Sequence, residues 1–412
     1  MMPVTNSPVN LKAHSDNTKS WFIFTLIFLV FDYGRPQDLL PIGFMRPSMI
    51  LMLCLLFFIG SNFAAVTACK SNQTRMIWYI LLLLLIYVPF AKNNYMAFHA
   101  FKNMFTYMLF IISVIVCVNS IERLKTLFKV YISLMVYVAI YSLLHNGVGS
   151  GNYFEDENDV SLYINMVLPF CFFLLLIEKN IWGKLFYGAA LVLGMMAVVV
   201  SFSRGGFVGL VVMFVVVWLV SPRKLLILFL ISLLAGGAYL LTDEEYKQEM
   251  STVTDTSDST ADDRLKSWGS AWDMFLDNPL GVGGGNFPSH FADYQGDKFE
   301  KGMAGRSAHS LWFTLIPELG IVGIILYMRL LLYNCKDILF VRKVARHKDP
   351  SMIYIYALST AFMASLAGHF ASATFISVFY YPHFWYLSGI IVATVRVYHT
   401  LPDVNKISTS SA

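Results

Sequence analysis

Charged residues are scarce in this chain. Of its 412 residues only 14% are Asp, Glu, Lys or Arg, whereas 57% are hydrophobic. Soluble domains carry about 25% charged residues, so this chain cannot cover a surface that faces water on all sides. The formal net charge of +4 comes from basic residues in short connections between apolar runs. A water-soluble protein is therefore excluded, and no nucleic acid partner is expected.

Cysteines and the common metal motifs are also few or missing. The five cysteines fall within apolar runs or at their ends: Cys54, Cys69, Cys117, Cys171 and Cys335. This placement indicates neither a disulfide framework nor a thiolate metal site. The sequence has no HExxH, no CxxC and no paired-carboxylate set, and the glycine-rich stretch 281–285 lacks the preceding strand and the GK[ST] of a nucleotide site. We therefore expect no metal and no other cofactor.

Long apolar runs dominate what is present. Several reach roughly 18–22 residues, enough for a helix to cross about 30 Å of hydrocarbon. The sequence predicts an all-α polytopic membrane protein with about 12 transmembrane helices. The expected spans are 21–34, 48–68, 76–91, 98–118, 126–144, 159–178, 182–201, 205–220, 224–242, 309–333, 351–371 and 376–398. The first of these is read as a membrane helix, because no small-residue cleavage site follows it.

Lysine and arginine are distributed unequally between the two sets of short loops. One set contains Lys70, Arg75, Arg123, Lys125, Lys129, Lys179, Lys184, Arg223, Lys224, Arg342, Lys343, Arg346 and Lys348. The opposite set contains fewer basic residues, and one of its loops is acidic from Glu155 to Asp159. The positive-inside rule then places both termini in the cytoplasm.

This topology divides the chain into five parts. We expect a cytoplasmic tail (1–20), a bundle of about nine helices (21–242), one long outward loop (243–308), about three further helices (309–400) and a second cytoplasmic tail (401–412). Part of the loop has apolar residues at helical spacing, at Leu265, Trp268, Ala271, Trp272 and Phe275. That spacing predicts an amphipathic helix.

Arg204 is the first candidate for a functional residue. It lies in Ser201-Phe202-Ser203-Arg204-Gly205-Gly206, between two very apolar spans. An arginine beside hydrocarbon costs at least about 2.5 kcal/mol unless it is paired or hydrated, so a function is the default hypothesis. Its guanidinium suits phosphate, and a neighbouring glycine such as Gly205 lets an anion approach the backbone. The structural alternative is that Arg204 reaches the interface while Gly205 and Gly209 pack against another helix.

Three further residues of the outward side are candidates. His309 precedes the tenth span, and a neutral imidazole can take a proton from a hydroxyl. Arg264 follows two aspartates in the long loop, and Arg35 lies in Arg35-Pro36-Gln37-Asp38 of the first outward loop. Each has a structural alternative: a satisfied interfacial histidine, a solvated arginine and a solvated turn. Glu318, inside the tenth span, needs a partner if it is charged, and Gly320 with Gly323 predicts close helix packing.

Together these segments resemble the O-antigen ligase / O-antigen polymerase superfamily. Ser203-Arg204-Gly205-Gly206 is similar to the S-R-G-G segment ahead of that family's periplasmic loop. His309-Ser310, nine residues and Gly320-Ile321-Val322-Gly323 fit its H-[NSQ]-x9-G-x-x-[GTY] pattern. Arg264, followed by Pro279-Leu280-Gly281-Val282-Gly283, is similar to its loop arginine and P-L-G-x-G turn. The ligase pattern R-x3-L is Arg264-x3-Trp268 here, a departure that concerns the ligase subgroup.

The resemblance implies a metal-independent, inverting glycosyltransferase in the bacterial inner membrane with its site at the periplasmic face. The donor would be a glycan on undecaprenyl pyrophosphate, bound by Arg204 and Arg264 with Ser203, Gly205 and Arg35 beside them. His309 would orient or deprotonate the acceptor hydroxyl. The acceptor stays open between lipid A-core, a growing polysaccharide and a protein side chain, the last making the chain a protein O-oligosaccharyltransferase.

The rival from another class is a membrane transporter of a small anion such as bicarbonate. Twelve spans are typical of secondary carriers, but carriers place polar or broken-helix sites near the midplane. Here the mid-span regions are nearly free of charge, and polar residues gather at one outer face. This distribution favours the enzyme.

Overall fold

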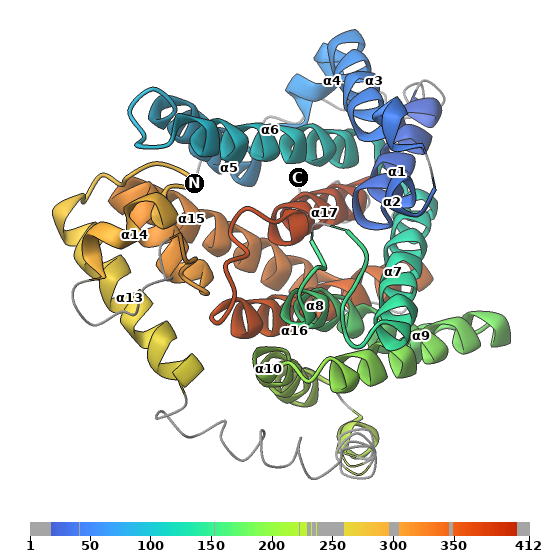
Figure 1. Cartoon of the computed structure of the whole chain (residues 1–412). Coiled ribbons are helices and arrows are strands. Elements are labelled where there is room, and N and C mark those ends of the chain that lie inside the picture. The colour runs from blue at the N-terminus through green and yellow to red at the C-terminus, as the bar shows by residue number, and fades with distance from the viewer. Residues whose placement is uncertain are drawn as a thin grey trace.

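The computed structural model describes residues 18–40, 42–151, 153–221, 223–228, 232, 236, 259–295, 305–345 and 349–401 (Figure 1). Most of the two predicted tails, most of the predicted ninth span and residues 243–258 and 296–304 of the long loop lie outside these ranges. Within them the chain is helical, with no strand. The prediction of an all-α fold is confirmed for this part of the chain.

Helices occupy the predicted spans with small shifts at their ends. The first half contains α1 (Lys19–Tyr33), α2 (Pro36–Leu39), the 3-10 turn η2 (Gly43–Met45), α3 (Pro47–Ser61), α4 (Phe63–Ala68), α5 (Asn72–Tyr87), α6 (Asn94–Cys117), α7 (Ile121–Leu144) and α8 (Glu157–Ile177). The second half contains α9 (Ile181–Val200), α10 (Arg204–Val220), α13 (Ser259–Asp277), α14 (Phe287–Tyr294), α15 (Leu311–Val344), α16 (Pro350–Ala373) and α17 (Pro382–Thr400). The single span expected over 48–68 is divided between α3 and α4, because the helix breaks at Asn62.

Seven of the described helices are long and apolar enough to cross a membrane. They are the segment Gly43–Ser61, which includes η2 and α3, and the helices α6, α7, α8, α9, α15 and α16. α10 is apolar but shorter. By length and composition, these helices suit a polytopic membrane protein. The count of twelve spans and the side that each loop faces stay predictions.

The bundle is organised around α8. This helix packs against α7, α9, α10 and α16, and nearly all of its side chains from Asp159 to Leu174 are buried. Burial on all sides places α8 in the centre of the bundle, whereas α3, which buries only Leu51 and Leu55, is peripheral. Figure 1 shows α8 and α16 in the middle of the view, with α3 at its edge.

Small residues let α10 approach this centre. A Cβ added at Gly209 would lie 1.9 Å from Ser372 Oγ and 2.9 Å from Asn165 Nδ2, so only glycine fits between α10, α16 and α8. Asn165 in turn donates to the carbonyl of Gly206 over 2.7 Å. Gly209 therefore packs against other helices, as small residues at the interfaces of membrane helices usually do.

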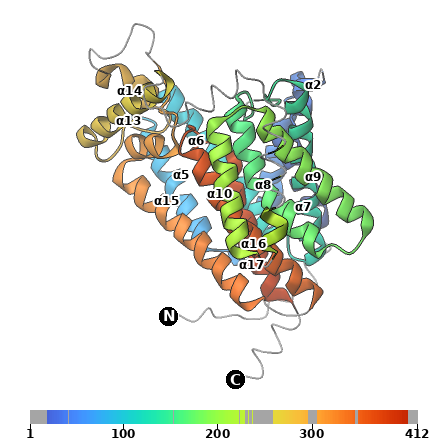
Figure 2. The ribbon, with the colours of Figure 1, turned by 90° about the horizontal axis from the view of Figure 1, so that it is seen from below.

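The long loop folds against one end of the bundle. α13 and α14 pack on each other and on α15, and Figure 2 shows them together at one end of the molecule, beside the start of α15. Ala271 and Met274 of α13 are buried with Phe287 and Phe291 of α14 in a small separate core. Leu265 and Trp272 are exposed, so only one side of the amphipathic segment is covered.

Candidate functional site

The N-terminus of α10 places Arg204 next to the start of α8. Ser203 is the N-cap of α10: its Oγ accepts from the backbone N–H of Gly206 over 2.8 Å and donates to Asn158 Oδ1 over 2.5 Å. A serine at this position ends the preceding turn and starts the helix at Arg204. Arg204 is half-buried there, at the positive end of the helix dipole.

The segment that carries His309 is held by a tryptophan of α13. Trp268 donates its Nε1–H to the carbonyl of Ala308 over 3.0 Å, and its ring stacks on Phe313 at 5.0 Å between centroids. His309 is half-buried with a left-handed φ of 47°, immediately before the N-cap Ser310 of α15. Leucine, which the ligase pattern has at the position of Trp268, could not donate this hydrogen bond. The departure from the pattern thus supplies a hydrogen bond that leucine could not form.

Arg264 belongs to the same cluster. It precedes Trp268 by four residues on α13, which places the two side chains on one face of the helix. Burial is the largest cause that lowers the pKa of His309, followed by the positive charges of Arg306 and Arg264. The negative charge of Asp156 raises this pKa. Arg264, Arg306 and Asp156 therefore lie close enough to His309 to act on its charge, and the imidazole is neutral at pH 7.

Two aromatic rings connect this cluster with the start of α10. A Cβ added at Gly205 would lie 3.4 Å from the Cβ of Phe375, which follows α16. The ring of Phe375 lies 6.4 Å from the ring of Trp268. The helix start with Arg204 and the segment with His309 therefore border one aromatic wall, and the structure brings Arg204, Arg264 and His309 to one end of the bundle.

Arg35 is placed differently. It precedes α2 with φ of 46°, its Nε donates to Asp38 Oδ2 over 2.8 Å, and its side chain lies against Gly151 in the connection between α7 and α8. The contacts that join Arg204, Arg264 and His309 do not include it. Its predicted role in substrate binding stays a prediction.

Two of the segments that resemble the superfamily, 279–283 in the loop and 320–323 in α15, lie against each other. The backbone N–H of Ile321 donates to the carbonyl of Pro279 over 2.9 Å, and that of Gly283 donates to the carbonyl of Glu318 over 2.9 Å. Gly320 breaks α15 with φ of 59°, and a Cβ there would lie 2.3 Å from the carbonyl carbon of Leu280. The expectation that Gly320 packs against another helix is wrong, because its missing side chain admits the loop turn instead.

Glu318 fixes the same turn. Its Oε2 accepts from the backbone N–H of Gly285 over 2.7 Å and from the hydroxyl of Tyr380 over 2.6 Å, and its Oε1 accepts from the backbone N–H of Phe287 over 2.9 Å. The sequence indicates that Glu318 needs a partner. The loop and the connection between α16 and α17 together supply it. The carboxyl joins three segments that are far apart in the chain.

Glu318→Gln should loosen the loop. The amide lacks one of the two acceptor oxygens, and each buried backbone donor left without a partner costs about 1–3 kcal/mol. Tyr380→Phe removes one hydrogen bond without leaving a backbone donor unpaired, so its effect should be smaller. Limited proteolysis between Asn278 and Phe287 in detergent should be fastest for Glu318→Gln, slower for Tyr380→Phe and slowest for the wild type. Equal cleavage rates would contradict this function of Glu318.

Sequence reasoning missed Asp156 and Arg306 as site residues. Asp156 is an exposed N-cap of α8, and the sequence gives no sign that the start of α8 comes within electrostatic range of His309. Arg306 forms an ion pair with Asp263 of α13 over 2.9 Å. The only available sign for Arg306 was its position three residues before His309. Among the described residues no group of three His, Cys, Asp or Glu side chains is arranged to hold a metal.

The helices and the site together define a helical membrane protein whose polar residues meet at one end of the bundle. Residues 189–328, about a third of the chain, match the family model described as O-antigen ligase. No curated protein matches the chain. This match confirms the resemblance to the O-antigen ligase and polymerase superfamily that the sequence shows.

The matched segment includes Arg204, Arg264 and His309. The match supports an O-antigen ligase-like function in general, a membrane environment, and lipid-linked glycan and polysaccharide partners. With the apolar helices it indicates a bacterial membrane protein.

Proposed function

We propose that the chain is a glycosyltransferase that moves a glycan from undecaprenyl pyrophosphate to an acceptor hydroxyl at the periplasmic face. The observation that carries the proposal is the arrangement of Arg204, Arg264 and a neutral His309 around the wall of Trp268 and Phe375. Two cations and a neutral imidazole at one end of the bundle suit a reaction in which an anionic group leaves while a hydroxyl attacks. The predicted outward orientation of this end supports the periplasmic location.

Arg204 and Arg264 bind the pyrophosphate in this mechanism. Both are half-buried, and guanidinium groups form paired hydrogen bonds with phosphate oxygens. The start of α10 adds backbone N–H groups and the positive end of its dipole at Gly205. Their positive charge stabilises the negative charge that develops on the leaving pyrophosphate, a role that metals play in many other glycosyltransferases.

His309 is the base. As the acceptor oxygen bonds to the anomeric carbon, the proton of its hydroxyl passes to the imidazole. The bond from the anomeric carbon to the phosphate oxygen breaks, and undecaprenyl pyrophosphate leaves with the electron pair. Direct displacement of this kind inverts the configuration at the anomeric carbon. Arg264 and Arg306 favour it by keeping His309 unprotonated before the reaction.

The acceptor is lipid A-core or the end of a growing polysaccharide, the two that the family match favours. The test is transfer by the purified chain from a carrier-linked glycan to each acceptor, with a protein acceptor in parallel. Transfer to lipid A-core defines a ligase, and transfer to glycan defines a polymerase. Absence of transfer to all three acceptors, by protein that is monodisperse and binds the donor, would contradict the proposal.

The pH dependence of transfer should report His309. Because the active form is neutral, the rate should rise with pH through the pKa of His309 and then stay level. Burial and two arginines lower this pKa from 6.5, so the rate should already be level at neutral pH. Asp156→Asn keeps a good N-cap but removes the group that raises the pKa, so the acid limb should move to lower pH. Arg306→Gln removes a cation and should move the limb to higher pH.

The matched control is Lys266→Gln. Lys266 is on α13 and pairs with Asp262, but it is not among the groups that shift the pKa of His309. Its pH profile of kcat/KM should coincide with that of the wild type. Shifts of the same sign in Asp156→Asn and Arg306→Gln would show that the limb does not report His309.

A further inference from the structure

A pocket of about 330 Å³ lies between α4, α5 and α6, away from the candidate site. The opposite end of α5 faces the long loop, since Tyr87 donates to the carbonyl of Leu280. The backbone N–H of Asn93, just before α6, also donates to Asn286 of the loop, over 2.7 Å. The pocket is at the other end of these helices, beside Ser71 at the start of α5. By the distribution of basic residues, this end is predicted to be cytoplasmic.

The break at Asn62 creates the pocket. The chain turns there from α3 into α4, and both helices contact α6, so α4 forms one wall, α5 the opposite wall and α6 the floor. Arg396 of α17 supports the floor from behind: its Nη1 donates to Cys69 Sγ over 2.6 Å and to the carbonyl of Ile115 over 2.5 Å. The pocket is thus a built feature of the fold.

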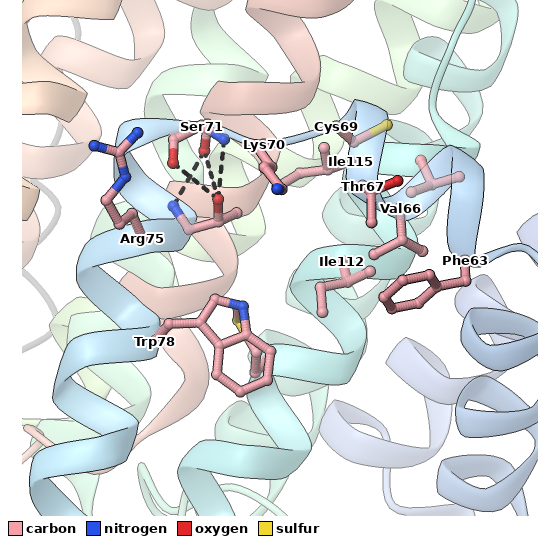
Figure 3. A pocket seen from close by; sticks show the side chains of 13 residues that line it. Phe63, Val66, Thr67, Cys69, Lys70, Ser71, Arg75, Trp78, Ile112 and Ile115 are labelled. Atoms are coloured by element: carbon pink, nitrogen blue, oxygen red, sulfur yellow. Dashed lines mark hydrogen bonds between the residues drawn. The ribbon is translucent and has the colours of Figure 1, made fainter.

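The lining is apolar along its length and basic at one end. Figure 3 shows Trp78 of α5 and Phe63 of α4 on its two sides, with Ile112 and Ile115 between them and Lys70 near the start of α5. Along α6 the lining runs from Val116 to Met108, about 12 Å along the helix axis. An apolar channel of this length that runs along membrane helices matches the direction of a lipid acyl chain.

Lys70 and Arg75 supply positive charge at the end of this channel. No acidic residue lines the pocket, and neither cation forms an ion pair with a carboxylate of the described residues. The carboxylate of Asp337 accepts from Gln73 of α5 over 2.6 Å instead. Both cations are exposed, so a phosphate at the membrane surface can reach them.

We propose that this pocket binds an anionic glycerophospholipid, with an acyl chain between Trp78 and Phe63 and the headgroup phosphate at Lys70 and Arg75. Tryptophan at the level of the headgroups and basic side chains at the membrane surface are the residues that such a lipid meets at a bilayer boundary. The bound lipid would hold α4 against α5 and α6. This binding is separate from the glycan-transfer site at the opposite end.

The experiment uses the full chain in nanodiscs with a trace of phosphatidylglycerol that carries a photoreactive acyl chain. Crosslinked peptides should come from residues 63–78 and 108–116. Unlabelled phosphatidylglycerol should compete about tenfold better than phosphatidylethanolamine, from the contribution of two basic residues near anionic lipid. Inorganic phosphate should not compete, because it lacks the chain that fills the apolar channel.

Variants separate the two parts of the proposal. The double variant Lys70→Gln with Arg75→Gln should abolish the preference for phosphatidylglycerol. The matched control is Lys179→Gln with Lys184→Gln, which changes one exposed cation between α8 and α9 and one in the first turn of α9. It should keep the preference for phosphatidylglycerol. Ile112→Trp should fill the channel and prevent crosslinking while both cations remain. Equal competition by the two lipids, full competition by inorganic phosphate, or crosslinking that none of these variants reduces would overturn the proposal.

Discussion

His309→Ala should reduce kcat/KM for glycan transfer by about 10²- to 10⁴-fold, the usual contribution of a positioned general base. The imidazole is half-buried, and burial followed by Arg306 and Arg264 lowers its pKa, so it is available as a neutral proton acceptor. The loss should appear mainly in kcat, because His309 acts on the acceptor proton in the transition state. The measurement is the initial rate with purified protein and a carrier-linked glycan.

His290→Ala is the matched control. His290 is also a half-buried histidine of the long loop with a lowered pKa, but it lies on α14, where burial and then Lys92 lower the pKa. It should retain at least about half of the wild-type rate. Equal losses in the two variants would show that the loop tolerates neither change and that His309 has no special chemical function.

Arg204→Ala should lower kcat by about 10²- to 10³-fold, the loss typical when one group that stabilises transition-state charge is removed. Arg204→Lys should recover little of it, because a single ammonium cannot form the paired hydrogen bonds of a guanidinium. The packing of α10 should persist in both variants, because it depends on Ser203, Gly206 and Gly209. The measurement is transfer rate per unit of protein in purified membranes.

Arg46→Ala is the control for a general effect of positive charge. Arg46 is exposed in the short connection before α3 and takes no part in the site. It should transfer at the wild-type rate. Full activity of Arg204→Lys would show that only the positive charge of Arg204 is needed. Full activity of Arg204→Ala would contradict its function in binding the pyrophosphate.

The sequence predicts the membrane helices well because the physical requirement is simple. A helix in hydrocarbon needs a long apolar run, and such runs mark α6 to α10 to within five residues at each end. Ends that depend on particular contacts are less predictable. α15 continues to Val344, beyond the apolar run, and α17 starts at Pro382 after a connection that hydropathy assigned to the span. Hydropathy gives no sign of the break at Asn62, so the pocket that the break creates could not be predicted either.

The site was predictable as separate segments and not as an arrangement. Arg204 and His309 stand out because polar residues are rare beside apolar runs, and the superfamily patterns identify them together with Arg264. The hydrogen bond from Trp268 to Ala308 and the bonds that Glu318 accepts from the loop and from Tyr380 join residues 31 to 62 positions apart. Their formation depends on how the loop folds over α15. Asp156 could not be recognised at all, because its effect on His309 depends on where the folded chain places the start of α8.

The most direct test of the account measures transfer from undecaprenyl-pyrophosphate glycan by the wild type and His309→Ala, both with EDTA. The account predicts wild-type transfer that EDTA leaves unchanged, a product with inverted anomeric configuration, and a loss of at least about 100-fold in the variant. Transfer that EDTA abolishes would contradict a mechanism based on arginines. If His309→Ala retained transfer, His309 would not be the base. The assignment of this end of the bundle as the active site would then also be wrong.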